Sequence, residues 1–357
     1  MTTTAENMAQ HGLGAHSHGS GVPAAVRVAA TRADREDPSE VPAGREESWR
    51  FTPMKRLRGL VPGTAATGEA TVEVDAPADA RVEVVARDDD RIGVAGRPVD
   101  YVTQFAWNSF DKATLVTVPR EVRLPGPATV TVTGPGEGRT AYGHLQVRAE
   151  PNASAVVVVD YRGGGLFADN VEFLVEDGAR LTVVSIQDWA DDAVHVSAQH
   201  AALGRDATLR HTMVTLGGDV VRLSPTVTYT APGGDAELLG LYFADAGQHL
   251  EHRTFVDHAV PNCKSNVAYK GALQGDGAHT VWIGDVLIRA AESIVALVTA
   301  AGDMAGSSRA HIQESVTHCV NDIITRLPDY YNVLNSGHPA ALNHVLADVA
   351  TIVDGWA

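Results

Sequence analysis

The chain has 357 residues, and 28 lysines and arginines against 44 aspartates and glutamates give a formal net charge of −16. Hydrophobic residues make up 44%, enough for a sizeable core. The acidic balance argues against a nucleic-acid or anionic-membrane surface, because both need clustered Lys and Arg. No apolar run approaches the ~20 residues of a membrane span. Two cysteines cannot build a disulfide framework, so we expect a cytoplasmic protein.

Residues 1–45 hold few large apolar side chains and are predicted to form a disordered tail. His11, His16 and His18 lie on a glycine-rich stretch, which invites a metal-binding interpretation. We favour a solvated tail, because a flexible tether does not hold three imidazoles in place.

Order is expected to begin near Glu46, with residues 46–69 forming an N-terminal lid. Trp49 and Phe51 are expected to cap the neighbouring core. Residues 54–60 form a short amphipathic segment, which Gly59 and Pro62 end. The basic side chains of this segment are expected to face water.

Residues 70–289 form the predicted core and carry an almost purely β pattern. Segments such as 71–74, 81–85 and 128–133 alternate with period two between Gly, Pro and Asp residues. Helical periodicity is nearly absent, apart from a possible turn around residues 101–110.

An internal repeat runs through this core, in which Asp and Ala open a strand. Ala179, Ala207 and Ala236 are 28 and 29 residues apart, and Ala278 belongs to a more distant copy. A repeat of this length without helices predicts a mainly β fold, a β-solenoid whose stacked coils share one core. Small residues beside each Asp suit tight corners. A β-sandwich is the alternative, but it need not repeat a phrase at constant spacing.

Residues 290–357 are predicted to form a small helical unit that packs against the end of the solenoid. Ile312, Val316, Val320 and Ile323 recur at helical spacing within residues 310–327. A second helix is predicted after Pro339. His311, His318 and Cys319 are interpreted as ordinary surface residues of the first helix.

Standard catalytic signatures are missing, so we expect a protein that is not an enzyme. The glycine run 163–165 lacks the Lys-Ser/Thr of a phosphate loop, and GxSxG, HExxH and paired CxxC motifs do not occur.

The densest polar cluster follows residue 248. In a strand, His249 and Glu251 share one face and His252 lies on the other. His258 and Cys263 flank a proline-containing turn, and imidazole and thiolate both suit iron or zinc. One cysteine and scattered histidines are too few for a closed site within one chain. The alternatives are a site completed by a partner subunit and a hydrogen-bonded polar ladder on the solenoid surface.

Three segments carry a family resemblance: Trp49–Pro53 with Arg56–Leu60, His258–Gly271 and His279–Arg289. They resemble the SufB/SufD family of iron–sulfur cluster assembly scaffolds, on its SufD side and in an actinobacterial style. The resemblance covers about residues 46–289. It implies a right-handed parallel β-helix, in agreement with the solenoid that the repeat predicts.

The resemblance further implies a non-catalytic scaffold subunit of the SUF system. Such a subunit would pair with a SufB-like subunit and a SufC-like ATPase, whose ATP hydrolysis rearranges the pair. We expect no stably bound cofactor, but transient handling of an Fe–S cluster at a subunit interface, with Cys263 and His258 as candidates. Nucleic-acid and membrane partners are not expected.

A second hypothesis is a β-solenoid enzyme or binding module that acts on a polymeric or small ligand. It would use stacked carboxylates such as Asp177, Asp206 and Asp235, although turn chemistry also explains these residues.

The tail departs from the family. Residues 290–357 lack its asparagine-rich strand motif, its late His-Gly-Ala-like turn with a functional histidine, and its Phe-Tyr-Leu-like stretch. Docking of the ATPase is therefore not carried over to this tail, which is a substituted or fused segment or the product of a rearranged reading frame.

Overall fold

The computed structural model describes residues 42, 44–60, 63–288 and 295–300. The predicted tail with His11, His16 and His18 lies outside these residues. The helices predicted beyond residue 300, with His311, His318 and Cys319, also lie outside them. Predictions about both segments therefore stay predictions.

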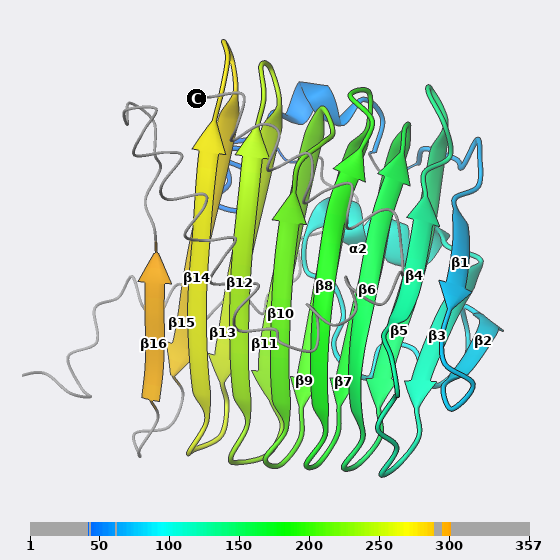
Figure 1. Ribbon diagram of the computed structural model, residues 1–357. Helices are drawn as coiled ribbons and strands as arrows, with labels where there is room; N and C mark the ends of the chain where they lie inside the picture. The colour runs from blue at the N-terminus through cyan, green and yellow to red at the C-terminus, as the bar shows by residue number, and fades with distance from the viewer. Residues whose placement is uncertain (1–41, 43, 61–62, 289–294, 301–357) are drawn as a thin grey trace, which may run out of the picture. The chain divides into compact units, whose positions relative to one another are not determined.

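The described chain builds two eight-stranded sheets, which we name sheet A and sheet B (Figure 1). Sheet A contains, in spatial order, β1 (Thr71–Asp75), β4 (Ala128–Thr133), β6 (Ser154–Gly163), β8 (Arg180–Trp189), β10 (Thr208–Thr215), β12 (Asp235–Ala244), β14 (Lys264–Leu273) and β16 (Val295–Ala300). Sheet B contains β15 (His279–Ile288), β13 (His249–His258), β11 (Val220–Tyr229), β9 (Val194–Leu203), β7 (Leu166–Val175), β5 (Thr140–Ala149), β3 (Lys112–Val118) and β2 (Arg81–Ala86).

From β3 onward, successive strands alternate between the sheets, so each coil of the chain adds one strand to each sheet. From β4 and β3 onward, all neighbours within a sheet are parallel. Only β1 on β4 and β2 on β3 pair antiparallel, at the N-terminal end. Because sandwiches are built from antiparallel sheets, this pairing excludes the β-sandwich alternative. The predicted β-solenoid is confirmed.

From β8 to β14, neighbouring coils of sheet A lie in register at intervals of 27 to 29 residues. Arg180 pairs with Thr208, which pairs with Asp235, and Asp235 pairs with Lys264. The third copy of the repeat is displaced by two residues from its predicted alignment, because Ala236 pairs with Leu209. A shift of two preserves which side chains point inward, so the sequence pattern hides it.

One corner of the solenoid uses the same backbone conformation in successive coils. After Glu121 (63°) in the first coil, the residues that have positive φ at this corner are Asn152 (60°), Gly178 (69°), Asp206 (55°), Gly233 (89°) and Asn262 (60°). Glycine adopts this left-handed conformation without a steric penalty, and Asn and Asp tolerate it better than other residues. The corner therefore selects these residue types.

A small buried residue follows each of these turn residues. The column contains Ala153, Ala179, Ala207, Gly234 and Cys263. Bulky side chains at these positions would separate the coils. Cys263 is thus the structural equivalent of the alanines of earlier coils, a relation that the sequence alone did not show.

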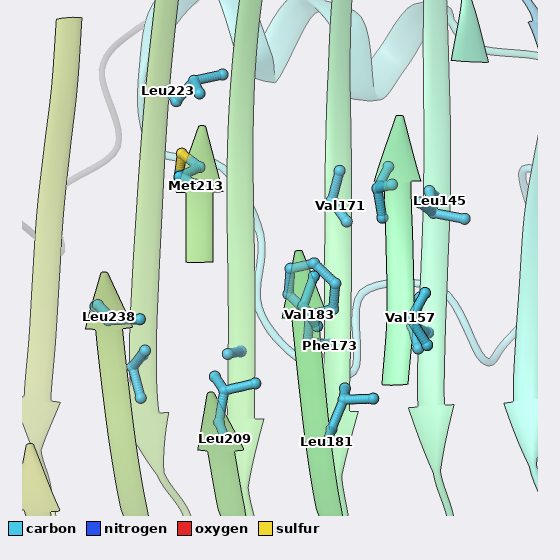
Figure 2. Close-up of a cluster of buried hydrophobic side chains, with 14 of the residues drawn as sticks. Leu145, Val157, Val171, Phe173, Leu181, Val183, Leu209, Met213, Leu223 and Leu238 are labelled. Atoms are coloured by element: carbon cyan, nitrogen blue, oxygen red, sulfur yellow. The ribbon is translucent and has the colours of Figure 1, made fainter. Parts of the chain in front are cut away.

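Inward side chains of both sheets form one continuous hydrophobic core. Figure 2 shows Leu181, Val183 and Leu209 from sheet A with Val171 and Phe173 from sheet B. All five are at most 2% exposed. Burial of such side chains contributes roughly 1.5–3 kcal/mol each.

Two segments cover the outer face of sheet B. Helix α2 (Tyr101–Ser109) is capped at its N-terminus by Asp100, whose side chain accepts a hydrogen bond from the Thr103 N–H at 3.1 Å. The second is residues 44–60, which we call the N-terminal segment and which includes the 3-10 helix η3 (Met54–Leu57). Apolar side chains of both join outward residues of β7, β9 and β11 in a second hydrophobic cluster.

The structure places the two aromatic residues of the predicted lid differently. Trp49 is fully buried in this second cluster, whereas Phe51 is 42% exposed. The prediction that Phe51 caps the core was therefore wrong.

Gly240 offers a direct test of how closely the coils pack. A Cβ atom at this position would lie 2.1 Å from Cδ1 of the buried Tyr269, which belongs to the next coil. We expect Gly240→Ala to lower the free energy of unfolding by about 1–3 kcal/mol, because the core must shift to admit the methyl group. Urea denaturation of the full chain measures this.

Gly126→Ala is the matched control, because a Cβ atom there has no neighbour within 4 Å. Its effect should stay within about 0.5 kcal/mol. Equal effects of the two substitutions would contradict the packing that we describe.

Candidate functional site

Strand β13 carries the predicted metal-site candidates on two different faces. Leu250 and Val256 point into the core, so His252 also points inward while His249 and Glu251 point outward. The structure thus brings His249 and Glu251 together and separates His252 from them, as the alternation predicts.

Glu251 is the centre of a buried polar cluster on the outer face of sheet B. Its carboxylate accepts hydrogen bonds from Thr52 Oγ1 at 2.8 Å, Arg253 Nη1 at 3.2 Å and Arg222 Nε at 3.3 Å. His249 Nε2 lies 3.2 Å from the same carboxylate. Glu251 itself is 0% exposed. Two arginines and a histidine therefore surround one buried anion.

The same arginines hold the N-terminal segment. The Arg222 guanidinium stacks on the Trp49 ring, 3.8 Å from its centroid, and donates to the Ser48 carbonyl at 2.8 Å. Arg253 donates to the Glu47 carbonyl at 3.1 Å. The Glu251 cluster therefore attaches the N-terminal segment to sheet B, and the charges of the cluster have a structural role.

The basic residues of the N-terminal segment attach it a second time. Arg56 donates to the carbonyls of Asp219 at 2.7 Å and Gly247 at 2.6 Å, and Arg58 forms an ion pair with the Asp219 carboxylate. The prediction that these charges only face water was therefore wrong for Arg56 and Arg58.

Electrostatics keeps Glu251 charged despite its burial. Burial alone would raise the pKa of Glu251, but Arg222, the hydrogen bonds from His249 and Thr52, and Arg253 outweigh it. The pKa of this carboxyl therefore lies well below its ordinary value. The stabilisation is fully present above the unfolded pKa of about 4.3 and is lost only as the pH falls through the lowered folded pKa.

His249 also contacts the next coil. Its ring stacks on that of the exposed His279, and the two Nδ1 atoms lie 3.0 Å apart. One of these nitrogens must carry the proton and the other must accept it. Across the described ranges, no three His, Cys, Asp or Glu side chains converge to hold a metal ion. The metal candidates therefore stay predictions.

His252 lies inside the solenoid. Its Nε2 is 2.9 Å from Thr215 Oγ1, and its ring stacks on Tyr242. Burial lowers the pKa of His252 to about 3, so the imidazole is neutral.

Cys263 and His258 both lie in the interior beside the corner that joins β13 to β14. Cys263 Sγ lies 3.6 Å from the Pro261 carbonyl and 3.7 Å from the Ala231 carbonyl, and His258 Nε2 lies 2.9 Å from Ser265 Oγ. Burial raises the pKa of the Cys263 thiol and lowers the pKa of His258. The structure shows no hydrogen bond between Cys263 and His258.

An interior polar network was not found from the sequence. Asp169 accepts from Tyr161 OH at 2.8 Å and lies 3.1 Å from His195 Nε2, and His195 Nδ1 lies 2.8 Å from Gln187 Oε1. His195 and Gln187 are 0% exposed. The alternation of side chains along the strands places Asp169 and His195 inward, and this pattern could have indicated the network from the sequence. The network lies inside the core, so we assign it a structural role in the packing of the two sheets.

A second outward carboxylate, Glu172 on β7, was also missed. It accepts hydrogen bonds from the backbone N–H groups of Gly93 at 2.7 Å and Ala95 at 2.9 Å, and lies 2.9 Å from His144 Nε2. Burial would raise the pKa of Glu172, but these partners lower it. Glu172 thus attaches the loop before α2 to sheet B, as Glu251 attaches the N-terminal segment.

The acids of the repeat are held at corners. Asp177 accepts from the Arg205 N–H at 2.7 Å, Asp206 has the left-handed turn conformation, and Asp235 accepts from Arg210 at 2.8 Å. Turn chemistry and an ion pair therefore account for all three.

A comparison with protein families finds a match to most of the solenoid. Residues 131–296 match the family described as "SUF system FeS cluster assembly, SufBD core domain". The chain belongs to the SufBD family. The matched span includes the outward cluster on β13 and the Cys263 corner.

Similar curated proteins come from mycobacteria. Iron-sulfur cluster assembly SufBD family protein Mb1497 of Mycobacterium bovis is 62% identical over 261 residues. SufBD family protein ML0594 of Mycobacterium leprae is 59% identical over 259 residues. Each match covers 71% of this chain and 66% of the relative, slightly less than two thirds of its length. ML0593 of M. leprae is 27% identical over 117 residues, which is 33% of this chain and 14% of the relative.

The described residues contain no helix that is long and apolar enough to cross a membrane.

The buried Glu251 cluster predicts a large effect of neutralisation. Glu251→Gln leaves Arg222 and Arg253 without their shared anion, so we expect a loss of roughly 3–5 kcal/mol in the free energy of unfolding. We also expect faster proteolysis within residues 46–60, because the attachment is lost. Denaturant unfolding and limited proteolysis measure the two effects.

Glu83→Gln is the control, because Glu83 forms an exposed ion pair with Arg91. Such pairs contribute about 0–1 kcal/mol. An unchanged proteolysis pattern for Glu251→Gln would show that Glu251 does not attach the segment.

The Cys263 column predicts that an alanine is tolerated. Cys263→Ala should cost about 1 kcal/mol or less, since Ala153, Ala179 and Ala207 fill the same position. Cys263→Leu should cost about 1–3 kcal/mol through overpacking. In the folded chain the buried thiol should resist iodoacetamide, which peptide mapping measures. Rapid alkylation of Cys263 would refute this placement.

Proposed function

We propose that the chain is a non-catalytic scaffold subunit of a SUF iron–sulfur cluster assembly complex. In this proposal it is the SufD-type subunit and pairs with a SufB-like subunit and a SufC-like ATPase in the cytoplasm. The observation that carries the proposal is the match of the β-solenoid to the SufBD core domain. The printed names of its mycobacterial relatives support the same role.

The relatives also support a complex of two different SufBD subunits. M. leprae has both ML0594, to which this chain is 59% identical, and ML0593, to which it is 27% identical. M. bovis likewise has Mb1497 and Mb1496. A complex of two unequal SufBD subunits requires two diverged SufBD proteins in one organism. In this proposal the chain corresponds to the first of each pair, ML0594 and Mb1497.

The use of the polar residues supports a scaffold over an enzyme. Glu251, Glu172 and Asp219 attach covering segments, and Asp169 with His195 is enclosed in the core. A catalytic group must reach its substrate, whereas these groups are engaged within the fold. The proposed work of the chain is therefore to present a rigid flank to its partners.

The cargo in this proposal is a nascent Fe–S cluster, which the chain handles transiently at a subunit interface and does not keep as a cofactor. Cys263 and His258 are the candidates for cluster contact. Because both point inward, contact requires the 259–263 corner to open or the partner to rearrange it. An ATPase-driven rearrangement of the subunit pair would supply that motion.

Purification of the tagged full chain from its native host under anaerobic conditions tests the proposal. We expect a SufB-like subunit and a SufC-like ATPase to co-purify in fixed proportion, with ATP-dependent cluster formation in the complex. Reciprocal tagging of the SufB-like subunit is the control, and it should recover this chain.

Failure of both purifications at low salt would overturn the proposed pairing. A monomer that turns over a substrate by itself would overturn the non-catalytic role.

A further inference from the structure

His249 and His279 form a hydrogen-bonded pair of imidazoles on the outer face of sheet B. They lie directly opposite each other on the neighbouring strands β13 and β15 (Figure 1). Their Nδ1 atoms are 3.0 Å apart, and the two ring planes differ by only 9°. His249 is 3% exposed, whereas His279 is an exposed residue. The pair therefore opens to solvent on the side of β15.

The contact with Glu251 decides which nitrogen of the neutral His249 ring carries the proton. The charged Glu251 carboxylate can only accept hydrogen bonds, and His249 Nε2 lies 3.2 Å from it. Nε2 therefore carries the proton, and Nδ1 directs a lone pair at His279. Histidines that bind metals in proteins have the same arrangement, in which a carboxylate accepts from one ring nitrogen and the metal binds the other.

The two Nδ1 atoms are separated by nearly the distance between two ligands of one metal ion. Zinc binds imidazole nitrogen at about 2.0–2.1 Å in tetrahedral geometry, which places two ligand nitrogens roughly 3.3 Å apart. The observed 3.0 Å needs to widen only slightly, and the exposed His279 ring can turn toward the ion. When His279 binds through Nδ1, its proton moves to Nε2, so the neutral pair releases no net proton.

His195 provides a contrast, because it also contacts a carboxylate and yet has a structural role. Its Nε2 lies 3.1 Å from Asp169, and its Nδ1 lies 2.8 Å from Gln187 Oε1. The His195 side chain is 0% exposed, so a hydrated ion has no access to it. The His249–His279 pair differs in having one ring at the surface.

We propose that His249 and His279 bind one divalent first-row transition-metal ion through their Nδ1 atoms, and that Glu251 orients His249. Imidazole suits zinc, iron, copper and nickel ions. Within the described ranges no group of three His, Cys, Asp or Glu side chains forms a metal site, so water completes the coordination and the ion exchanges with solvent. The proposal does not depend on the proposed function.

Titration of the full chain with Co²⁺ tests this site. Co²⁺ lies between iron and nickel in the order of affinities for such ligands. The background for all variants carries His11→Ala, His16→Ala and His18→Ala, because histidine-rich tracts also bind metals. We expect the background chain to bind a Co²⁺ ion that His279→Ala binds at least about tenfold more weakly. Isothermal titration calorimetry measures both affinities.

His279→Cys distinguishes metal ligation from a merely structural role. A thiolate also suits these ions, so we expect the cysteine variant to restore binding of Co²⁺. It should also add a thiolate-to-cobalt charge-transfer absorption band that the background chain lacks. Cys263 and Cys319 are present in both chains, so they contribute equally to the baseline.

Asp276→Asn is the matched control, because it removes an exposed charge close to His279 and no proposed ligand. It should leave the Co²⁺ affinity unchanged, which excludes a general attraction of cations to a chain with a net charge of −16. Mg²⁺, which prefers oxygen ligands, should not compete with Co²⁺. Circular dichroism should show the same strand content in every variant.

Any of three results would overturn the proposal. The first is an unchanged Co²⁺ affinity in His279→Ala. The second is equal weakening by His279→Ala and Asp276→Asn, which would indicate diffuse attraction to the acidic surface. The third is a His279→Cys variant that does not restore binding or lacks the charge-transfer band, which would leave the pair as a hydrogen bond between neighbouring coils.

Discussion

The stacking of coils depends on one corner, where each turn must close in the left-handed conformation and be followed by a small residue. Asn152, Asp206 and Asn262 meet the first demand, and Ala153 and Ala207 meet the second. A bulky residue in either place would separate the coils and break the parallel ladders on both sheets at once, because the strands on either side share the corner. This corner therefore aligns neighbouring coils, and the alignment decides which side chains lie next to one another in the core and on both outer faces.

The outer face of sheet B is covered through paired charges. Two buried carboxylates, Glu172 and Glu251, each bind a segment that precedes β3 in the chain. Burying a carboxylate costs several kcal/mol unless it is well paired, so each anion accepts only a segment that brings the right donors. Sheet B therefore fixes a particular covering.

The sequence predicted the class of fold because alternation and repeat are local properties. It placed His249 and Glu251 on one face and His252 on the other for the same reason. It did not predict the partners of Arg56 and Glu251, since Asp219 and Thr52 lie more than 160 residues away along the chain. From β8 to β14 the coil spacing also varies between 27 and 29 residues, which displaced one alignment by two residues without a visible change in pattern. Contacts between distant segments follow from stacking, and no single window of sequence contains them.

Cys263 shows how a reactive residue type can have a structural reason. Cys263 has the most reactive side chain of the His258–Gly271 motif. Its position in the coil is nevertheless the one that alanine occupies in three earlier coils. The thiol there is buried beside two carbonyl groups, and burial raises its pKa, so the reactive thiolate is disfavoured while the corner stays closed. Small size alone is enough to explain a cysteine at this place. Any reaction of the Cys263 thiol therefore requires the corner to open.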